Sequence, residues 1–210
     1  MSAARVVPSR VRHQRSRVRV VLRWVRWGIA LSGGVLLLAL FLAPTPSAPP
    51  LPRPFTKVAL DILPVLPGGP AQGYAGYAPS TALRLPAHSR ATITIRNFDL
   101  DATPLPIDSP FTRVEGTVGS VAYADGAPYS MLDRTRIAHT FTVPDLGLNV
   151  PIPSSAAHGR SYTVVTFSFF TGAHGIHQWR CHDPCGDGVD GLGGPMGDVE
   201  YMRGTLTIED

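Results

Sequence analysis

The sequence predicts an all-β domain, either a β-sandwich or a Greek-key barrel of about seven strands or more. Short segments rich in β-branched and aromatic residues show a hydrophobic period of two, as strands do: 55–63, 90–98, 136–143, 161–170 and 203–209. Twenty-one glycines and twenty-one prolines in the chain favour many turns. No segment after residue 55 has the period of an amphipathic helix, so strands should build the whole domain.

The individual segments indicate which side chains face the core. In residues 90–98, Ile93 and Ile95 alternate with threonines, which is typical of a sheet with one buried face. His139 shares a face with Phe141 and Val143. Trp179 alternates with Cys181 in another predicted strand and should pack in the core. Residues 64–81 are expected to form a loop or an irregular edge.

The N-terminal part predicts a membrane anchor. Residues 1–26 hold eight arginines and no acidic residue, and residues 27–43 then carry no charge over seventeen positions. That length is at the short end of what spans a bilayer as a helix, and arginines before a span favour a cytoplasmic N-terminus. A cleaved signal peptide is the alternative, disfavoured by the long basic region and by the six prolines of residues 44–54. We expect a cytoplasmic tail, a single-pass anchor in the lipid bilayer, a stiff spacer and an extracytoplasmic domain at 55–210.

The charge distribution argues against nucleic-acid binding. The net charge of +4 belongs to the tail, since residues 44–210 contain eleven basic and fifteen acidic side chains. A nucleic-acid-binding domain should carry its basic face on the folded part. The acidic domain would instead favour a basic face on a protein partner. Hydrolytic and phosphate-binding motifs are also absent from the sequence, and we expect no small-molecule substrate.

A group of soft donor side chains lies near the C-terminus, in the stretch "GIHQWRCHDPCGDGVDGLGGPM". Cys181 and Cys185 are the two cysteines of the chain, and Met196 follows in a loop that is rich in glycine. Thiolate, imidazole and thioether together suit copper. Two cysteines in an exported domain can also form a disulfide, and composition does not choose between the two.

The order of these motifs resembles the cupredoxin family, and within it the copper-bearing domain of cytochrome c oxidase subunit II. The similarity lies in "HTFTV" (139–143), a strand ending in "GIHQWRC", the loop "CHDPCG", a later methionine and a last strand "GTLTIE". It implies a cupredoxin-like Greek-key β-sandwich with copper ligands His139, Cys181, Cys185 and Met196. In the binuclear members the pattern is Cys-x-Glu-x-Cys-Gly-x-x-His-x-x-Met, whose glutamate donates its backbone carbonyl. Asp183 stands at that glutamate position.

The sequence also departs from this pattern at two positions whose side chains are metal ligands. Val189 stands where the binuclear pattern has its histidine, and Leu192 stands where it has its methionine. Met196 replaces that methionine only through a loop that is four residues longer. A binuclear centre would therefore lack one of its two imidazoles.

Three interpretations of the site follow from these residues. In the first, His139, Cys181, Cys185 and Met196 bind one copper ion. In the second, His182 supplies a further nitrogen donor. In the third, Cys181 and Cys185 form a disulfide and the domain holds no metal.

The expected function is that of a membrane-anchored, extracytoplasmic electron carrier. It would pass electrons through copper to or from a redox partner protein, as a subunit of or donor to a respiratory oxidase, without being an enzyme itself. The alternative is a copper-delivery protein, or a metal-free cupredoxin-like interaction module with a Cys181–Cys185 disulfide.

Overall fold

The structure is a computed structural model that describes residues 55–66, 74–156, 159, 161–186 and 188–210. The chain divides into two compact units, Met1–Leu51 and Pro52–Asp210. The predicted tail, anchor and spacer all lie outside the described residues. Within the part that the structure describes, no helix has both the length and the apolar character needed to cross a membrane.

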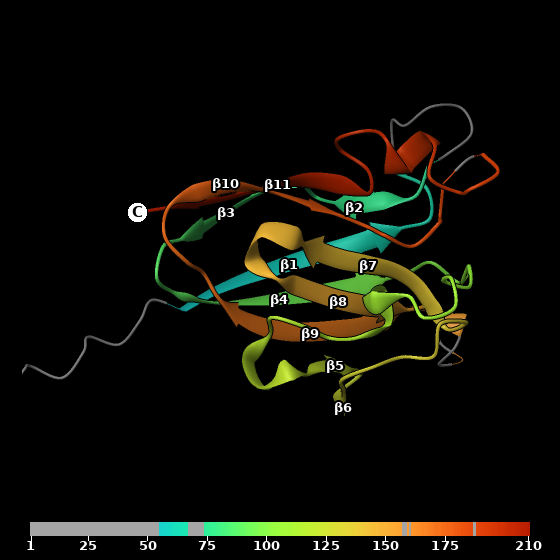
Figure 1. Cartoon of the computed structure of the whole chain (residues 1–210), viewed down its shortest axis with the longest axis horizontal. Helices are drawn as coiled ribbons and strands as arrows, with labels where there is room; N and C mark the ends of the chain where they lie inside the picture. The colour runs from blue at the N-terminus through green and yellow to red at the C-terminus, as the bar shows by residue number, and fades with distance from the viewer. Residues whose placement is uncertain (1–54, 67–73, 157–158, 160, 187) are drawn as a thin grey trace, which may run out of the picture. The chain divides into compact units, whose positions relative to one another are not determined.

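Two β-sheets form the domain (Figure 1). The six-stranded sheet has the order β2-β1-β4-β9-β5-β6, with β1 at Phe55–Leu63, β2 at Gly76–Ala78, β4 at Arg90–Asn97, β5 at Ala122–Ala124, β6 at Ala127–Tyr129 and β9 at Thr163–Phe170. The five-stranded sheet has the order β3-β11-β10-β7-β8, with β3 at Ala82–Pro86, β7 at Ile137–Val143, β8 at Leu148–Pro153, β10 at Gly175–Arg180 and β11 at Arg203–Glu209. The all-β prediction is thereby confirmed for the described residues.

Most neighbouring strands are antiparallel, but each sheet contains one parallel pair. β1 runs parallel to β4, and β11 runs parallel to β3. The predicted strands are present within a residue or two of their expected bounds. Of the predicted loop or irregular edge at 64–81, Gly76–Ala78 forms the edge, as the short strand β2 that pairs with the end of β1.

The core lies between the two sheets, and period-two burial produces it. Along β4 the buried positions are Ala91, Ile93, Ile95 and Asn97, as the alternation with threonine predicted. β9 contributes Val165, Phe167 and Phe169 to the same core, and β11 contributes Leu206 and Ile208. Each sheet thus has one apolar face, and the two apolar faces pack against each other.

β7 and β8 are buried on both faces, which strand alternation alone does not explain. The segment around η1, a short 3-10 helix at Pro110–Thr112, covers their outer face. Asn149 holds that segment: its side-chain amide donates to the carbonyls of Phe111 (3.3 Å) and Arg113 (2.6 Å). Two further backbone hydrogen bonds join Asn149 to Glu115. His139, on β7, is completely buried.

Candidate metal centre

A β-bulge directs His139 toward the end of the sandwich. The register of β7 and β8 shifts between Ile137 and His139, so that Ala138 has no partner of its own. A bulge of this kind bends its strand and re-aims the next side chain. The His139 side chain is completely buried, and its Nε2 lies 3.1 Å from the Asp99 carboxylate.

Cys181 lies where the chain leaves the sheet after β10. Its backbone N–H still donates to the carbonyl of Met202 at 2.7 Å, which ties this point to the strand that follows the loop. The Cys181 sulfur accepts the backbone N–H groups of Thr140, at 3.2 Å, and of Asp183, at 3.4 Å. Two fixed N–H donors therefore point at this sulfur, and both stabilise a thiolate there.

The glycine-rich loop brings Cys185 and Met196 to the same place. Cys185 Sγ lies 3.3 Å from Met196 Sδ, and Gly186 N–H donates to the carbonyl of Gly191 at 2.7 Å. A Cβ on Gly186 would lie 2.1 Å from the Gly193 carbonyl oxygen and 2.7 Å from Met196 Cγ. A side chain at position 186 would therefore push the methionine segment away from the cysteines.

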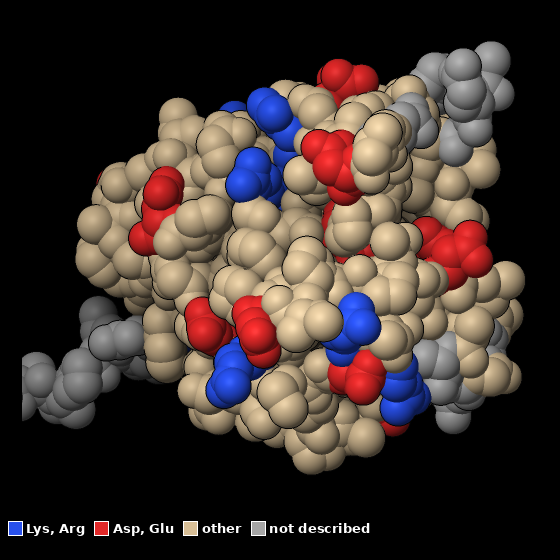
Figure 2. Space-filling view, turned by 45° about the vertical axis from the view of Figure 1, so that its right-hand side comes forward, with Lys and Arg blue, Asp and Glu red and all other residues tan. Residues whose placement is uncertain are grey.

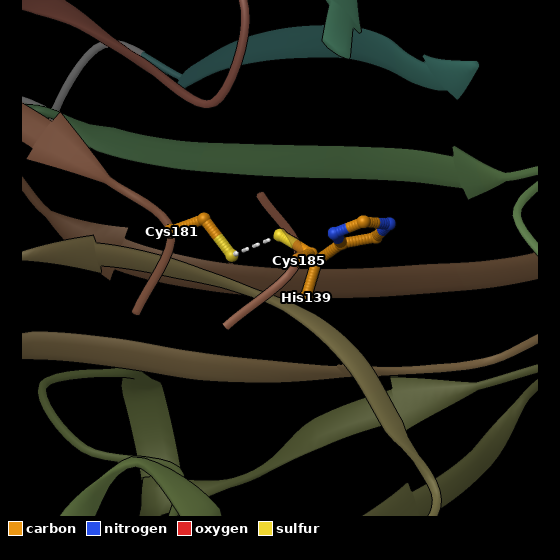
Figure 3. Close-up of side chains that lie close together, drawn as sticks. All are labelled: His139, Cys181 and Cys185. Atoms are coloured by element: carbon orange, nitrogen blue, oxygen red, sulfur yellow. Dashed lines mark hydrogen bonds between the residues drawn. The ribbon is translucent and has the colours of Figure 1, made fainter. Parts of the chain in front are cut away.

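Three donor atoms meet at this end of the domain, one each from His139, Cys181 and Cys185. They all lie within 4.8 Å of one another, and the two sulfurs are 3.6 Å apart (Figure 3). Both cysteines are free thiols, and Cys181 is buried. In Figure 3 one ring nitrogen of His139 lies on the side of the sulfurs. Since Nε2 pairs with Asp99, the nitrogen facing the sulfurs is Nδ1, which is buried and has no hydrogen-bond partner.

Packed aromatic side chains of the core lie next to these donors. Trp179 is fully buried, as predicted, and its indole N–H donates to the carbonyl of Thr81 at 2.9 Å. Its ring contacts Tyr77 and Phe141, with centroid distances of 4.7 Å and 5.1 Å. The Tyr77 hydroxyl donates to the carbonyl of Thr140 at 3.2 Å. Thr140 is thereby held on one side by Tyr77 while its N–H faces Cys181.

The charges of the site favour a thiolate beside an imidazolium when no metal is bound. Burial lowers the pKa of His139, but the hydrogen bond with Asp99 and the charge of the adjacent Cys181 sulfur outweigh burial and raise it to about 9. Burial raises the pKa of the Cys181 thiol. The hydrogen bond from Cys185, the adjacent charge of His139 and the hydrogen bond from the Thr140 backbone together outweigh burial and bring this pKa well below its ordinary value. The Cys185 pKa is raised, first by its hydrogen bond with Cys181 and then by burial. Cys181 is therefore ionised first.

Asp183 carries a buried carboxyl group close to Cys181. It is completely buried, and neither carboxylate oxygen has a hydrogen-bond partner. Burial, followed by the nearby Cys181 sulfur, raises the pKa of Asp183 to about 8. Its backbone carbonyl accepts the N–H of Cys185 at 2.8 Å, so this residue also shapes the turn between the two cysteines.

His182 does not join the three donors. Its ring stacks on Phe111 with a centroid distance of 3.9 Å, and its Nε2 accepts a hydrogen bond from Arg180 Nε at 3.1 Å. Its backbone N–H donates to Thr140 Oγ1 at 2.8 Å. The chain does leave the sheet at Cys181, but the ring turns to the outer face that the η1 segment covers. The structure thus brings together four of the five predicted ligands.

The donor set fits a copper ion. One imidazole nitrogen without a partner faces two thiols, with a thioether beside one of them, and soft ligands of this kind suit copper. Two thiolates on one tetrahedral ion at about 2.3 Å would stand about 3.8 Å apart, close to the observed 3.6 Å. Val189 and Leu192, the positions of the missing binuclear ligands, are both exposed. The single imidazole of the group favours one copper ion over a pair.

Sequence reasoning did not identify Asp99 or Thr140. Asp99 directly follows the predicted strand 90–98, and only the pairing of the sheets brings it to a histidine forty positions away. Thr140 acts mainly through its backbone, which a sequence does not mark. An acidic residue at the end of a core strand is the one signal that could have pointed to this part of the site.

Comparisons with known proteins gave matches only among solved structures. No protein-family model matches the sequence, and no curated protein matches it. Auracyanin B is 15% identical, with 80% of this chain and 94% of that one covered and a TM-score of 0.33. A chain of a heme-copper terminal oxidase dimer is 13% identical, with coverage of 93% and 100% and a TM-score of 0.35. Rusticyanin from Thiobacillus ferrooxidans is 15% identical, with coverage of 73% and 77% and a TM-score of 0.27.

Auracyanin B and rusticyanin are cupredoxins, the family that the cysteine loop resembles. TM-scores this low do not establish a shared fold, so the two-sheet architecture of this chain rests on its own strands and ladders. Fold and site together define an all-β sandwich protein with a buried group of soft donors at one end.

Proposed function

We propose that this chain is a copper-binding electron-transfer protein of the cupredoxin type. The proposal rests on one observation, the buried and unpartnered Nδ1 of His139 facing two free thiols. A histidine that served only the core would have a protein partner for both ring nitrogens. A disulfide alone would require neither this nitrogen nor the thioether of Met196 beside Cys185.

The closed character of the site supports electron transfer over catalysis. His139 and Cys181 are buried, and Cys185 and Met196 are partly buried, so a substrate has little access to the donors. Copper, when bound, supplies a one-electron couple. The chain holds the donors in place through the Asp99 contact to His139 and the N–H groups that point at Cys181. A site that does not rearrange between oxidation states exchanges electrons with little reorganisation.

The cellular setting is part of the same proposal. The uncharged stretch at 27–43, which follows eight arginines, supports a single-pass anchor with the N-terminus in the cytoplasm. The domain would then lie outside the cytoplasm and exchange electrons with a protein partner.

Copper loading tests the function directly. The purified protein with both thiols reduced is loaded with copper and freed of excess, and metal per chain is measured with visible absorption and EPR spectra. We expect one tightly held copper ion and an intense thiolate-to-copper band, with a hyperfine pattern that distinguishes one copper from a coupled pair.

Two variants give the test its controls. Cys181→Ser removes the thiol that ionises first and should remove most of the band, whereas His88→Ala, in a turn far from the site along the chain, should leave it unchanged. A reduced protein that binds no copper would overturn the proposal. The cysteines would then be a disulfide pair of an interaction module.

A further inference from the structure

Basic and acidic side chains are interspersed on the surface of the domain. A charged partner would therefore be recognised by a small group of residues. Figure 2 shows basic and acidic side chains in small groups on one face. Two of the arginines are paired with acidic neighbours. Arg84 pairs with Glu209 at 2.9 Å, and Arg96 pairs with Asp61 at 2.7 Å. Two other arginines, Arg180 and Arg203, have no such acidic partner among the described residues and lie where the chain enters and leaves the cysteine loop.

Two arginines stand opposite each other next to Cys181. Arg180, the last residue of β10, is the direct cross-strand partner of Arg203, the first residue of β11. Cross-strand partners have Cβ atoms about 5 Å apart, and like charges in such a pair destabilise a sheet. Among the described residues, no carboxylate forms an ion pair with either arginine, and the one polar contact of the Arg180 guanidinium is Nε to His182. Two adjacent positive charges are thus left without a counter-charge.

A groove of about 300 Å³ lies between these arginines. Its lining is mainly apolar and consists of Pro144, Gln178, Trp179, Arg180 and Arg203. A volume of this size is enough for one side chain or a small anion. Because Arg180 ends β10 and Cys181 follows it, the groove lies at the end of β10 where the chain enters the cysteine loop.

We propose that this groove is the docking point for an acidic side chain of the redox partner protein. The inference rests on the proposed electron-transfer function. A guanidinium binds a carboxylate through two parallel hydrogen bonds, and two guanidiniums flanking an apolar floor select a carboxylate on a protein surface. This local preference differs from the expectation from net charge alone, which is a basic face on the partner. Two arginines are too few for a phosphate backbone, which is recognised by an extended basic stripe.

The test uses the metal-free protein with reduced thiols, so that its result does not depend on copper binding. Amide chemical shifts are followed by NMR during titration with a blocked hexaglutamate peptide. We expect saturable shifts at residues 178–180 and 203–204. Arg180→Gln and Arg203→Gln should each weaken binding about threefold, and the double variant about tenfold.

Arg84→Gln is the matched control, because it removes the same charge from the same sheet at a residue that is already paired. Its affinity for the peptide should stay within twofold of the original. Glutamine keeps most of the arginine stem, and an unchanged unfolding midpoint confirms that the variants fold.

Peptide binding that is insensitive to the double variant, or shifts confined to other residues, would overturn the proposal. Tighter binding of a hexathymidylate than of the peptide would also overturn it, in favour of nucleic acid. A failure to load copper leaves this test intact, so the two proposals fail separately.

Discussion

Asp183→Asn should stabilise the metal-free protein, and the gain should grow as pH rises. Asp183 is completely buried, and its carboxylate oxygens have no partner, so ionising it within the fold is costly. Burial raises its pKa from 3.8 to about 8. The folded state therefore prefers the neutral acid, and this contribution to stability is present below pH 4 and is lost as pH rises toward 8. Asparagine has the same shape and does not ionise.

The size of the effect follows from the shift in pKa. Each pKa unit corresponds to about 1.36 kcal/mol, so the free energy of unfolding of the Asn variant should exceed that of the original by up to about 4 kcal/mol at pH 7. Near pH 4 the two proteins should differ by less than about 1 kcal/mol, because both carry a neutral side chain there. Between these values the difference should increase steadily.

Urea unfolding of the metal-free, reduced protein at several pH values between 4 and 8 measures this difference. Asp198→Asn, at an exposed position of the same loop, is the control and should change stability by no more than about 0.5 kcal/mol at any pH. A difference between Asp183→Asn and the original that is constant from pH 5 to pH 8 would refute the reasoning. The carboxylate would then be solvated or paired in solution.

Three predictions concern metal binding. Asp99→Asn should weaken copper binding about 10- to 100-fold in a competition titration, because the carboxylate orients the His139 ring. His182→Ala should leave the affinity within about threefold, since that ring contacts Phe111 and Arg180 instead of the donors; a tenfold loss would restore it as a ligand. Cu(I) affinity should rise at least about tenfold per pH unit between pH 6 and 8, because His139, whose pKa is about 9, must lose its proton to bind. A pH-independent affinity would show that His139 is not a ligand.

The strands were predictable where alternation decides burial. In β4, Ile93 and Ile95 face the core and the threonines between them face outward, as the sequence indicated. β8 was missed because its residues, "LNVPIP", are buried throughout and contain two prolines. Its outer face is covered by the η1 segment, which is a tertiary effect that no local pattern carries. Strands of three residues, such as β5 and β6, are too short to show a period.

The candidate site was predictable in its donor types and not in its supporting contacts. His139, Cys181, Cys185 and Met196 were found because their side chains have the chemistry of metal ligands. His182 has the same chemistry, and its placement away from the donors depends on a stack with Phe111 that sequence spacing does not show. The same is true of the Ala138 bulge, which arises from a register shift between strands.

The parallel pairing of β1 with β4 has a practical consequence for handling this domain. Both strands point toward the end that carries the donors, since Asp99, the partner of His139, follows β4. Phe55 therefore lies at the opposite end, one strand of nine residues or about 30 Å away (Figure 1). A domain immobilised on an electrode or a bead through a tag before Phe55 would present its donor end outward. Voltammetry and binding assays on such a surface can thus reach the centre without the attachment covering it.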